Sequence, residues 1–228
     1  STKFFPTDNP TAAFLNTLAT FAAGFVVRPF GALVFGRLGD LIGRKYTFSI
    51  TLLLMGSATF LMGCIPSYES IGFWAPVLVL VLRLLQGLAL GGEYGGAATY
   101  VAEHAPANKR GYWTSWIQTT ATIGLFISLL VIMLTRLALS QEDFNNWGWR
   151  VPFWISILLV AVYYFIRKKM GESLLFESLK AEGSVSKNPL KESFGNKDNF
   201  KFVLLALFGA TMGQGVIWYT GQFYAMNF

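Results

Sequence analysis

Six long apolar runs are the feature of this sequence that most restricts its fold. Each contains roughly 20 apolar-dominated residues, the length that an α-helix needs to cross the hydrocarbon core of a bilayer. The runs are Thr11–Phe35, Tyr46–Ile65, Phe73–Tyr100, Trp113–Thr135, Trp147–Ile166 and Phe202–Phe228. Membrane β-strands are about ten residues long and alternate in polarity, unlike these runs. The sequence therefore predicts an all-α, polytopic helical membrane protein.

The composition agrees with this prediction. Only 13% of the 228 residues are charged, whereas a soluble domain usually carries about 25%. The single cysteine, Cys64, excludes a disulfide within the chain and any multi-cysteine metal site. We therefore expect the lipid bilayer as a partner, and neither a metal nor an organic cofactor.

The positions of the basic residues predict the orientation of the helices. Thirteen of the 18 Lys and Arg residues fall in three alternate connections, and only three lie in the opposite connections and the N-terminal arm. The basic connections are residues 36–45, 101–111 and 167–201. By the positive-inside rule these three connections are cytoplasmic. Topology thus explains the net charge of +6, and we expect no nucleic-acid partner.

The connection 167–201 differs in composition from the rest of the chain, because it is rich in Lys, Glu, Ser and Gly. Apolar residues at helical spacing within GESLLFESLKAEG predict a short amphipathic helix on the membrane surface. We therefore predict an N-terminal helix bundle (1–166), a cytoplasmic linker (167–201) and the first helix of a second bundle (202–228). The chain lacks an initiating Met and ends in an apolar run, so we expect a fragment of a longer protein, with at least one helix before Ser1.

A glycine-rich, charged motif, GRLGDLIGRKY (36–46), forms the first cytoplasmic turn. Glycines allow two helix ends to approach and turn tightly, and Asp40 and Arg44 have the i, i+4 spacing of an ion pair. Here the sequence resembles the major facilitator superfamily, whose pattern at this place is G-x-L-a-D-x-x-G-R-K. The resemblance implies a cluster that latches the two halves of the protein together on the cytoplasmic side. The alternative is a basic loop with a helix cap.

The second cytoplasmic turn, EHAPANKRG (103–111), resembles the E-x-x-P-x-x-x-R-G motif of the same superfamily. Pro106 ends a helix, because it lacks a donor and clashes with the preceding turn. We expect Glu103 and Arg110 to join Asp40 and Arg44 in one charge cluster that breaks when a cytoplasmic gate opens. The predicted gate comprises Gly36, Asp40, Gly43, Arg44, Lys45, Glu103 and Arg110.

Two charged residues stand within the third apolar run, in VLRLLQGLALGGEYGG (81–96). A charge at the centre of a membrane helix costs roughly 2.5–3.5 kcal/mol, so we expect Arg83 and Glu93 to face a polar cavity or residues of other helices. Gln86 and Glu93 lie on nearly the same face of the predicted helix, and Arg83 lies about 80° away around the helix axis. All three are therefore placed to line a common cavity. Glycines at every fourth residue predict close packing against a partner helix.

The motifs R-x-x-Q-G and G-G-E-Y-G-G of this run resemble those of the metabolite:proton symporters within the superfamily. WGWRVPF (147–153) and GQGVIWYTGQFYA (213–225) resemble the sixth and seventh helices of that family. The resemblance implies a monomeric, multi-pass protein of the bacterial inner membrane. It implies alternating-access symport of protons with a carboxylate or a zwitterionic osmolyte such as betaine or proline. A sugar:proton symporter is the alternative, because the turn motifs are shared.

Within this framework, Glu93 is the candidate for proton coupling. The predicted substrate cavity is lined by Arg28, Arg83, Gln86, Gln118, Thr122, Gln214, Trp218, Tyr219 and Gln222. Aromatic rings beside amides suit a zwitterion or a quaternary amine through cation–π contacts, although ordinary helix packing explains such a stripe too. A structural role is equally open for Arg28. The sequence contains no H-E-x-x-H or G-x-S-x-G motif, so an enzyme is not expected.

Overall fold

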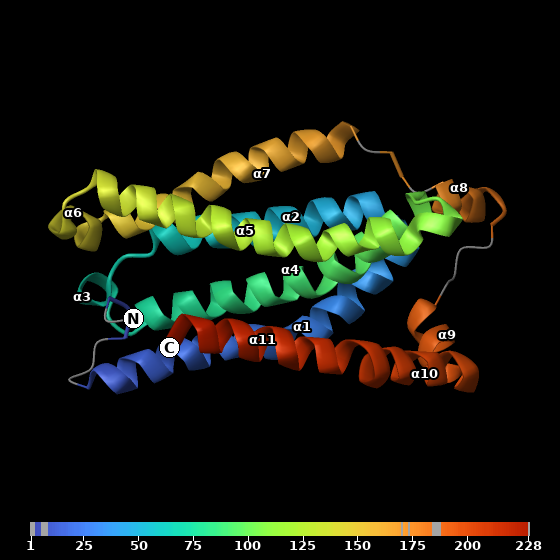
Figure 1. The fold of residues 1–228 in the computed structure, drawn as a ribbon, viewed down its shortest axis with the longest axis horizontal. Helices are drawn as coiled ribbons and strands as arrows, with labels where there is room; N and C mark the ends of the chain where they lie inside the picture. Colours follow the sequence, from blue (N-terminus) through green and yellow to red (C-terminus); the bar gives the residue numbers. More distant parts are fainter. Residues whose placement is uncertain (1–2, 6–8, 170, 173, 184–187, 228) are drawn as a thin grey trace. The chain divides into compact units, whose positions relative to one another are not determined.

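The computed structural model describes residues 3–5, 9–169, 171–172, 174–183 and 188–227 (Figure 1). The described residues form helices and turns and contain no strand, which confirms the predicted all-α fold. The chain divides into two compact units, Ser1–Val185 and Ser186–Phe228. The boundary between the units lies within the predicted linker 167–201.

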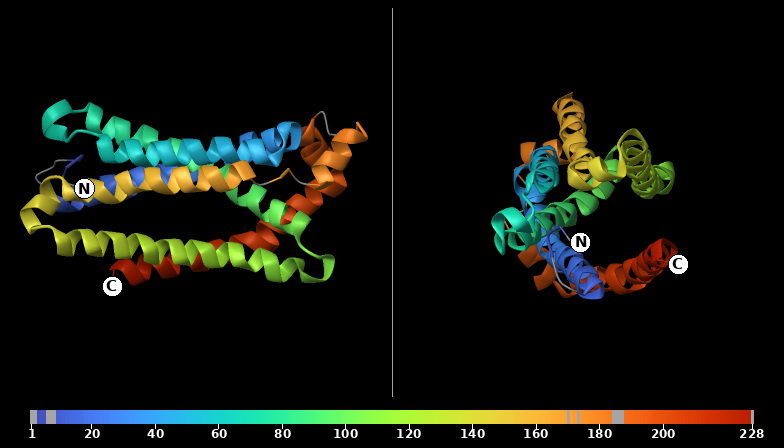
Figure 2. Two further views of the ribbon diagram at one scale, coloured as in Figure 1. Left: turned by 90° about the horizontal axis from the view of Figure 1, so that it is seen from above. Right: turned by 90° about the vertical axis from the view of Figure 1, so that its left-hand side faces the viewer.

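Five long helices build the first unit and run side by side (Figures 1 and 2). They are α1 (Pro10–Ile42), α2 (Arg44–Cys64), α4 (Trp74–His104), α5 (Arg110–Ala138) and α7 (Val151–Lys169). Among the described residues, five helical segments are long and apolar enough to cross a membrane, and they correspond to the first five predicted spans. The short elements are α3 (Tyr68–Ile71), η1 (Ala107–Lys109), α6 (Gln141–Asn146), η2 (Gly148–Arg150) and α8 (Leu174–Ala181).

Local signals in the sequence determine where α1 begins and ends. The side chain of Asn9 accepts hydrogen bonds from the backbone N–H groups of Thr11 and Ala12, at 2.9 and 3.4 Å, and Pro10 occupies the first turn. At the other end Gly43 takes φ of 102°, a conformation that suits glycine. The helix therefore continues to Ile42, and our placement of residues 36–42 in a turn is wrong.

The packing of α4 against α1 depends on glycine. A Cβ atom at Gly87 would collide with the backbone carbonyl oxygen of Gly24, and one at Gly91 would collide with that of Arg28. The predicted close packing of this glycine stripe is confirmed for Gly87 and Gly91. Gly95 differs, because a Cβ atom there would meet nothing within 4 Å.

Helix α2 packs between α4 and α7. Its apolar contact with α4 forms a small core of Ala58, Met62, Ile65, Val79 and Leu82. Many large apolar side chains on the outer faces are exposed instead, among them Phe30 and Leu137. Such surfaces suit a hydrocarbon environment, as the membrane prediction requires.

The second unit contains α9 (Pro189–Gly195), α10 (Lys197–Leu204), a π-helix labelled η3 (Leu205–Thr211) and α11 (Met212–Asn227). Residues 202–227 of the sixth predicted span are helical, but they are divided among α10, η3 and α11 and do not form one of the five candidate spans. The predicted short helix in the linker is present as α8 and belongs to the first unit.

Candidate functional site

The ends of α1, α2 and α4 that we predict to be cytoplasmic meet in a charged cluster centred on Arg44, the first residue of α2. Its Nη2 atom lies 3.2 Å from Glu103 Oε1 on α4 and 3.8 Å from Asp40 Oδ1 on α1. The side chains of Arg44 and Glu103 are 19% and 13% exposed, whereas that of Asp40 is 47% exposed. Water therefore screens the Arg44–Asp40 pair more than the Arg44–Glu103 pair.

Glu172, which we did not predict, completes this helix junction. Its carboxylate accepts hydrogen bonds from the backbone N–H of Arg44 at 3.1 Å and from that of Lys45 at 3.2 and 3.3 Å. The next residue towards the N-terminus, Gly171, accepts a hydrogen bond from the Tyr100 hydroxyl at 3.2 Å. Gly43 offers α2 no side-chain cap, so the sequence signals that an acceptor is needed. It does not signal which residue supplies the acceptor.

Two residues of the predicted gate behave differently from the prediction. Arg110 begins α5 and is exposed, and within the described part of the chain it forms no ion pair with the cluster. Its expected place in the charge cluster is therefore wrong. Lys45 takes part through its backbone N–H.

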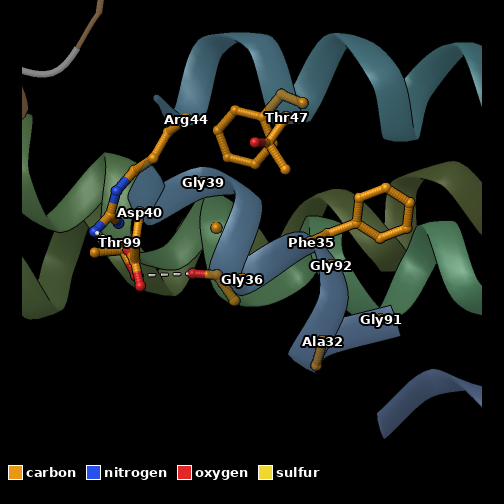
Figure 3. A pocket seen from close by; sticks show the side chains of 13 residues that line it. Ala32, Phe35, Gly36, Gly39, Asp40, Arg44, Thr47, Gly91, Gly92 and Thr99 are labelled. Carbon is orange, nitrogen blue, oxygen red and sulfur yellow. Dashed lines mark hydrogen bonds and ion pairs between the residues drawn. The ribbon is translucent and has the colours of Figure 1, made fainter. Parts of the chain in front are cut away.

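A cavity of about 240 Å³ lies beside the cluster, between α1, α2 and α4 (Figure 3). Gly36, Asp40 and Arg44 line it together with the glycines of α4, which leave room where side chains would otherwise stand. Figure 3 shows Asp40 and Arg44 on the same side of the cavity as Thr99. Three of the seven predicted gate residues thus line an open space between the helix ends.

A second, smaller cavity of about 100 Å³ lies between α1, α2 and α4 and brings three predicted substrate residues together. Arg28, Arg83 and Gln86 all line it. The Arg83 Nη1 atom donates to Gln86 Oε1 at 3.2 Å, and Gln86 Nε2 donates to Thr59 Oγ1 at 2.8 Å. The guanidinium carbons of Arg28 and Arg83 lie 3.8 and 5.5 Å from the ring centroids of Phe25 and Phe21.

Glu93 does not share this cavity. It lines a larger space of about 440 Å³ between α2, α4 and α7, beside Thr59, Ser156 and Tyr163. The prediction of one common cavity for Arg83, Gln86 and Glu93 is therefore wrong. Gln86 and Glu93 share a face of α4. They are seven residues apart in the sequence, however, and so lie about 10 Å apart along the helix axis. Met55 of α2 lines both cavities.

The remaining predicted cavity residues stay predictions. Gln118 and Thr122 are half-buried on α5 and line none of these three cavities. In the second unit, Trp218 is half-buried and Tyr219 is 37% exposed. The side chains of Gln214 and Gln222 lie outside the described residues. No group of three or more metal-ligating side chains occurs in the described part of the chain.

Comparison with known proteins identifies the fold and the family. A family model described as "Sugar (and other) transporter" matches residues 2–204. The chain belongs to the major facilitator superfamily. Proteins of this superfamily are membrane transporters, not enzymes. The chain is accordingly part of a multi-pass protein of the bacterial inner membrane.

Two major facilitator relatives from Escherichia coli (strain K12) show the similarity in detail. The chain is 43% identical over 175 residues to the shikimate transporter, covering 77% of this chain and 40% of that protein. It is 40% identical over 174 residues to the proline/betaine transporter, covering 76% of this chain and 35% of that protein. The chain thus spans less than half the length of these relatives.

A solved major facilitator structure shows the same fold. The xylose transporter XylE from E. coli, in a partially occluded inward-open conformation, matches with a TM-score of 0.67. The match covers 95% of this chain and 54% of that chain, at 20% sequence identity. At this identity the match supports the fold and not the substrate.

Proposed function

We propose that the full-length protein is a secondary active transporter that takes up a small organic solute together with protons by alternating access. The observation that carries this proposal is the pair of arginines lining one cavity between membrane-spanning helices. Charged side chains are expensive within a membrane span, and those that persist there mark substrate and ion pathways. In this fold the substrate site lies near the bilayer midplane, where the two halves meet.

The proposed substrate is a carboxylate or a zwitterionic osmolyte such as betaine or proline. Shikimate, proline and betaine, which the names of the two relatives specify, each carry a carboxylate group. A cavity lined by two guanidinium groups offers such a group favourable electrostatic contacts. The sugar:proton symporter is the second candidate, and the fold match to a xylose transporter favours it. A neutral sugar, however, carries no charge with which the two guanidinium groups lining the cavity could pair.

Glu93 is the proposed proton-coupling residue. It lies in a span and lines a cavity that the hydroxyl-bearing residues Thr59, Ser156 and Tyr163 also line. Thr59 also accepts a hydrogen bond from Gln86, which contacts Arg83. A chain of polar contacts therefore leads from the cavity of the arginines to the wall of the cavity that contains Glu93. This chain offers a route by which substrate binding and proton binding affect each other.

Uptake by the full-length protein in proteoliposomes tests the transport function. We expect an imposed inward proton gradient to drive accumulation of labelled shikimate, proline or glycine betaine, and an uncoupler to abolish it. Accumulation of xylose in place of these acids would favour the sugar symporter. Accumulation that follows a sodium gradient and ignores the uncoupler would contradict proton coupling.

The Glu93→Gln variant tests the proposed proton site. We expect it to lose gradient-driven accumulation and to retain exchange of labelled for unlabelled substrate, because exchange needs no net proton movement. Glu142→Gln, at an exposed position on α6, is the matched control and should accumulate substrate normally. Unchanged accumulation by Glu93→Gln would remove Glu93 from the coupling role.

A further inference from the structure

We propose that α2 is held in a single axial register against α7 by two glycine notches between the helices and by Arg150 and Glu172 at the two ends. A notch here is a position where a glycine of α2 leaves room for a side chain of α7. In this arrangement α2 does not slide along α7 when the protein changes conformation, so the two helices act as one unit. The inference concerns how the helices are held, and it stands apart from the proposed transport function.

The two notches lie between the middle of α2 and its C-terminal end. A Cβ atom at Gly56 would collide with Cγ2 of Val160, and one at Gly63 would lie 2.6 Å from the Cβ atom of Phe153. Gly56 precedes Gly63 by seven residues, and Phe153 precedes Val160 by seven residues. Seven residues are about two helical turns, so both contacts lie on one face of each helix. The order of the contacts shows that the helices are antiparallel.

The spacing of these contacts permits one register. A slide of one turn, about 3.6 residues or 5.4 Å, would bring Leu52 or Phe60 to the place of Gly56, opposite Val160. A large side chain has no room there, because even a Cβ atom at Gly56 collides with Val160. Overpacking of this kind is destabilising. The notch therefore opposes sliding in both directions.

The residues that flank α7 contact the two ends of α2. Arg150, directly before α7, donates from Nη1 to the carbonyl oxygen of Gly63 at 2.9 Å, in the last turn of α2. Glu172, just beyond the end of α7, accepts from the first two backbone N–H groups of α2. Backbone groups at a helix end lack partners within the helix, and a cation suits the C-terminal end and an anion the N-terminal end. Sliding of α2 in either direction would separate both contacts.

The register determines the frame of the cavity that Glu93 lines. Of the ten described residues that line this cavity, four belong to α2, five to α7 and one, Glu93, to α4. Gly56 and Val160 are among them, so one of the notches forms part of the cavity wall. The residues of α2 and α7 therefore keep their positions relative to one another, and the described lining changes shape through movement of α4 against this pair.

A compensating exchange of side chains tests the notch at Gly56. In the full-length protein, Gly56→Ala should raise the unfolding equilibrium constant at least about tenfold, as measured by titration with a denaturing detergent. Val160→Ala removes the methyl group with which the new Cβ atom collides. The double variant Gly56→Ala/Val160→Ala should therefore have an unfolding constant at least about fivefold lower than that of Gly56→Ala.

Two controls accompany this exchange. Phe153→Ala keeps the Cβ atom that Gly63→Ala would meet, so it should not rescue that variant. Gly124→Ala, on α5, places a Cβ atom where nothing lies within 4 Å and should not be destabilised. If Gly56→Ala yields no folded protein, recovery of folded protein by the double variant is the expected rescue. A double variant no more stable than Gly56→Ala, or a Gly56→Ala variant as stable as Gly124→Ala, overturns the notch.

Distances between spin labels test the register itself. Nitroxide labels are attached to exposed positions of the full-length protein in lipid nanodiscs, after Cys64 and any other cysteine have been replaced. The pairs Tyr46–Leu158 and Leu61–Phe165 join exposed residues along opposite diagonals of α2 and α7. Sliding of α2 by one turn would lengthen one distance and shorten the other, each by up to about 5.4 Å. We expect one distance for each pair, at acidic and alkaline pH and with or without shikimate, proline or glycine betaine.

Variants of the end contacts complete this test. Arg150→Ala/Glu172→Ala removes both contacts and should broaden both distance distributions. Arg136→Ala/Glu177→Ala removes the same two charges from exposed positions on α5 and α8 and should leave the distributions as narrow as in the wild-type protein.

The possible outcomes separate this inference from the proposed function. Two distances for each pair in the wild-type protein, shifted in opposite senses, overturn the single register even if proton-driven uptake is observed. Distributions that Arg150→Ala/Glu172→Ala leaves unchanged overturn the role of the end contacts. A single register that the end variants loosen, in a protein without proton-driven uptake, supports this inference and contradicts the transport function alone.

Discussion

The two charged regions of the first unit have opposite designs. At the helix junction around Arg44, cations and anions from different helices contact one another: Arg44 pairs with Glu103 and Asp40, and the Glu172 carboxylate accepts a hydrogen bond from the first N–H of α2. In the small cavity further along α1 and α4, Arg28 and Arg83 lie among aromatic rings and an amide, with no acid in the described lining. Both regions contain arginine, and among the described residues that form them only the first contains acidic side chains.

This difference separates two uses of a charge in a membrane protein. A salt bridge between helix ends holds those ends together and needs nothing from outside the protein. Charged side chains that line a cavity within a span are instead typical of substrate and ion pathways. We therefore propose that the junction acts as a conformational latch and that the cavity belongs to the substrate pathway.

The largest effect should come from changing the glycine contact that forms the cavity. Gly87→Ala places a Cβ atom against the Gly24 backbone, which cannot rotate away as a side chain can. We expect a loss of about 3 kcal/mol of stability, at the upper end of the range for overpacking. Titration of the purified protein with a denaturing detergent, followed by tryptophan fluorescence, measures it.

The matched control for this change is Gly95→Ala. Gly95 lies about two turns beyond Gly87 on α4, and a Cβ atom there would meet nothing within 4 Å. Alanine is the better helix former, so this variant should be neutral or stabilised by up to about 1 kcal/mol. Similar losses for both variants would show that the α1–α4 contact does not depend on the absence of a side chain at Gly87. The cavity would then need another explanation.

The helices and the close packing of α4 could be predicted from the sequence, because each depends on a local pattern. Apolar length predicts a span, and glycine at every fourth residue predicts a close helix contact. The end of α1 was harder to place. Gly36 and Gly39 resemble a turn, yet both are helical, and the chain turns at Gly43, where φ is positive.

The arrangement of the site depended on contacts between distant residues, which a single sequence does not report. Helix periodicity placed Gln86 and Glu93 on one face, but the packing of α2 assigns them to different cavities. Likewise, Glu172 lies 128 residues from the backbone N–H of Arg44 to which it hydrogen-bonds. Nothing in the local spacing connects these two residues.

A moderate effect should follow from breaking the central ion pair of the junction. We expect Glu103→Gln to cost about 2 kcal/mol, because Glu103 is nearly buried and forms the shorter contact with Arg44. Asp40→Asn should cost less than about 1 kcal/mol, because Asp40 is half exposed and its contact with Arg44 is longer. Double-mutant cycles with Arg44→Gln measure both coupling energies. A larger coupling energy for the Asp40–Arg44 pair than for the Glu103–Arg44 pair would contradict this prediction.

The smallest effect should come from removing the acceptor that caps α2. Glu172→Ala leaves the first N–H groups of α2 without this carboxylate, and the loss of a helix cap costs about 1 kcal/mol. The helix start is then solvated by water, so the junction loosens and the rest of α2 stays folded. Hydrogen exchange followed by mass spectrometry should show faster exchange in a peptide that begins near Arg44 and unchanged exchange in the middle of α2. Glu177→Ala, at an exposed position on α8, removes an equal charge from the same segment and should leave both peptides unchanged. Equal acceleration by the two variants would mean that the net charge of the segment protects α2, and not the hydrogen bonds of Glu172.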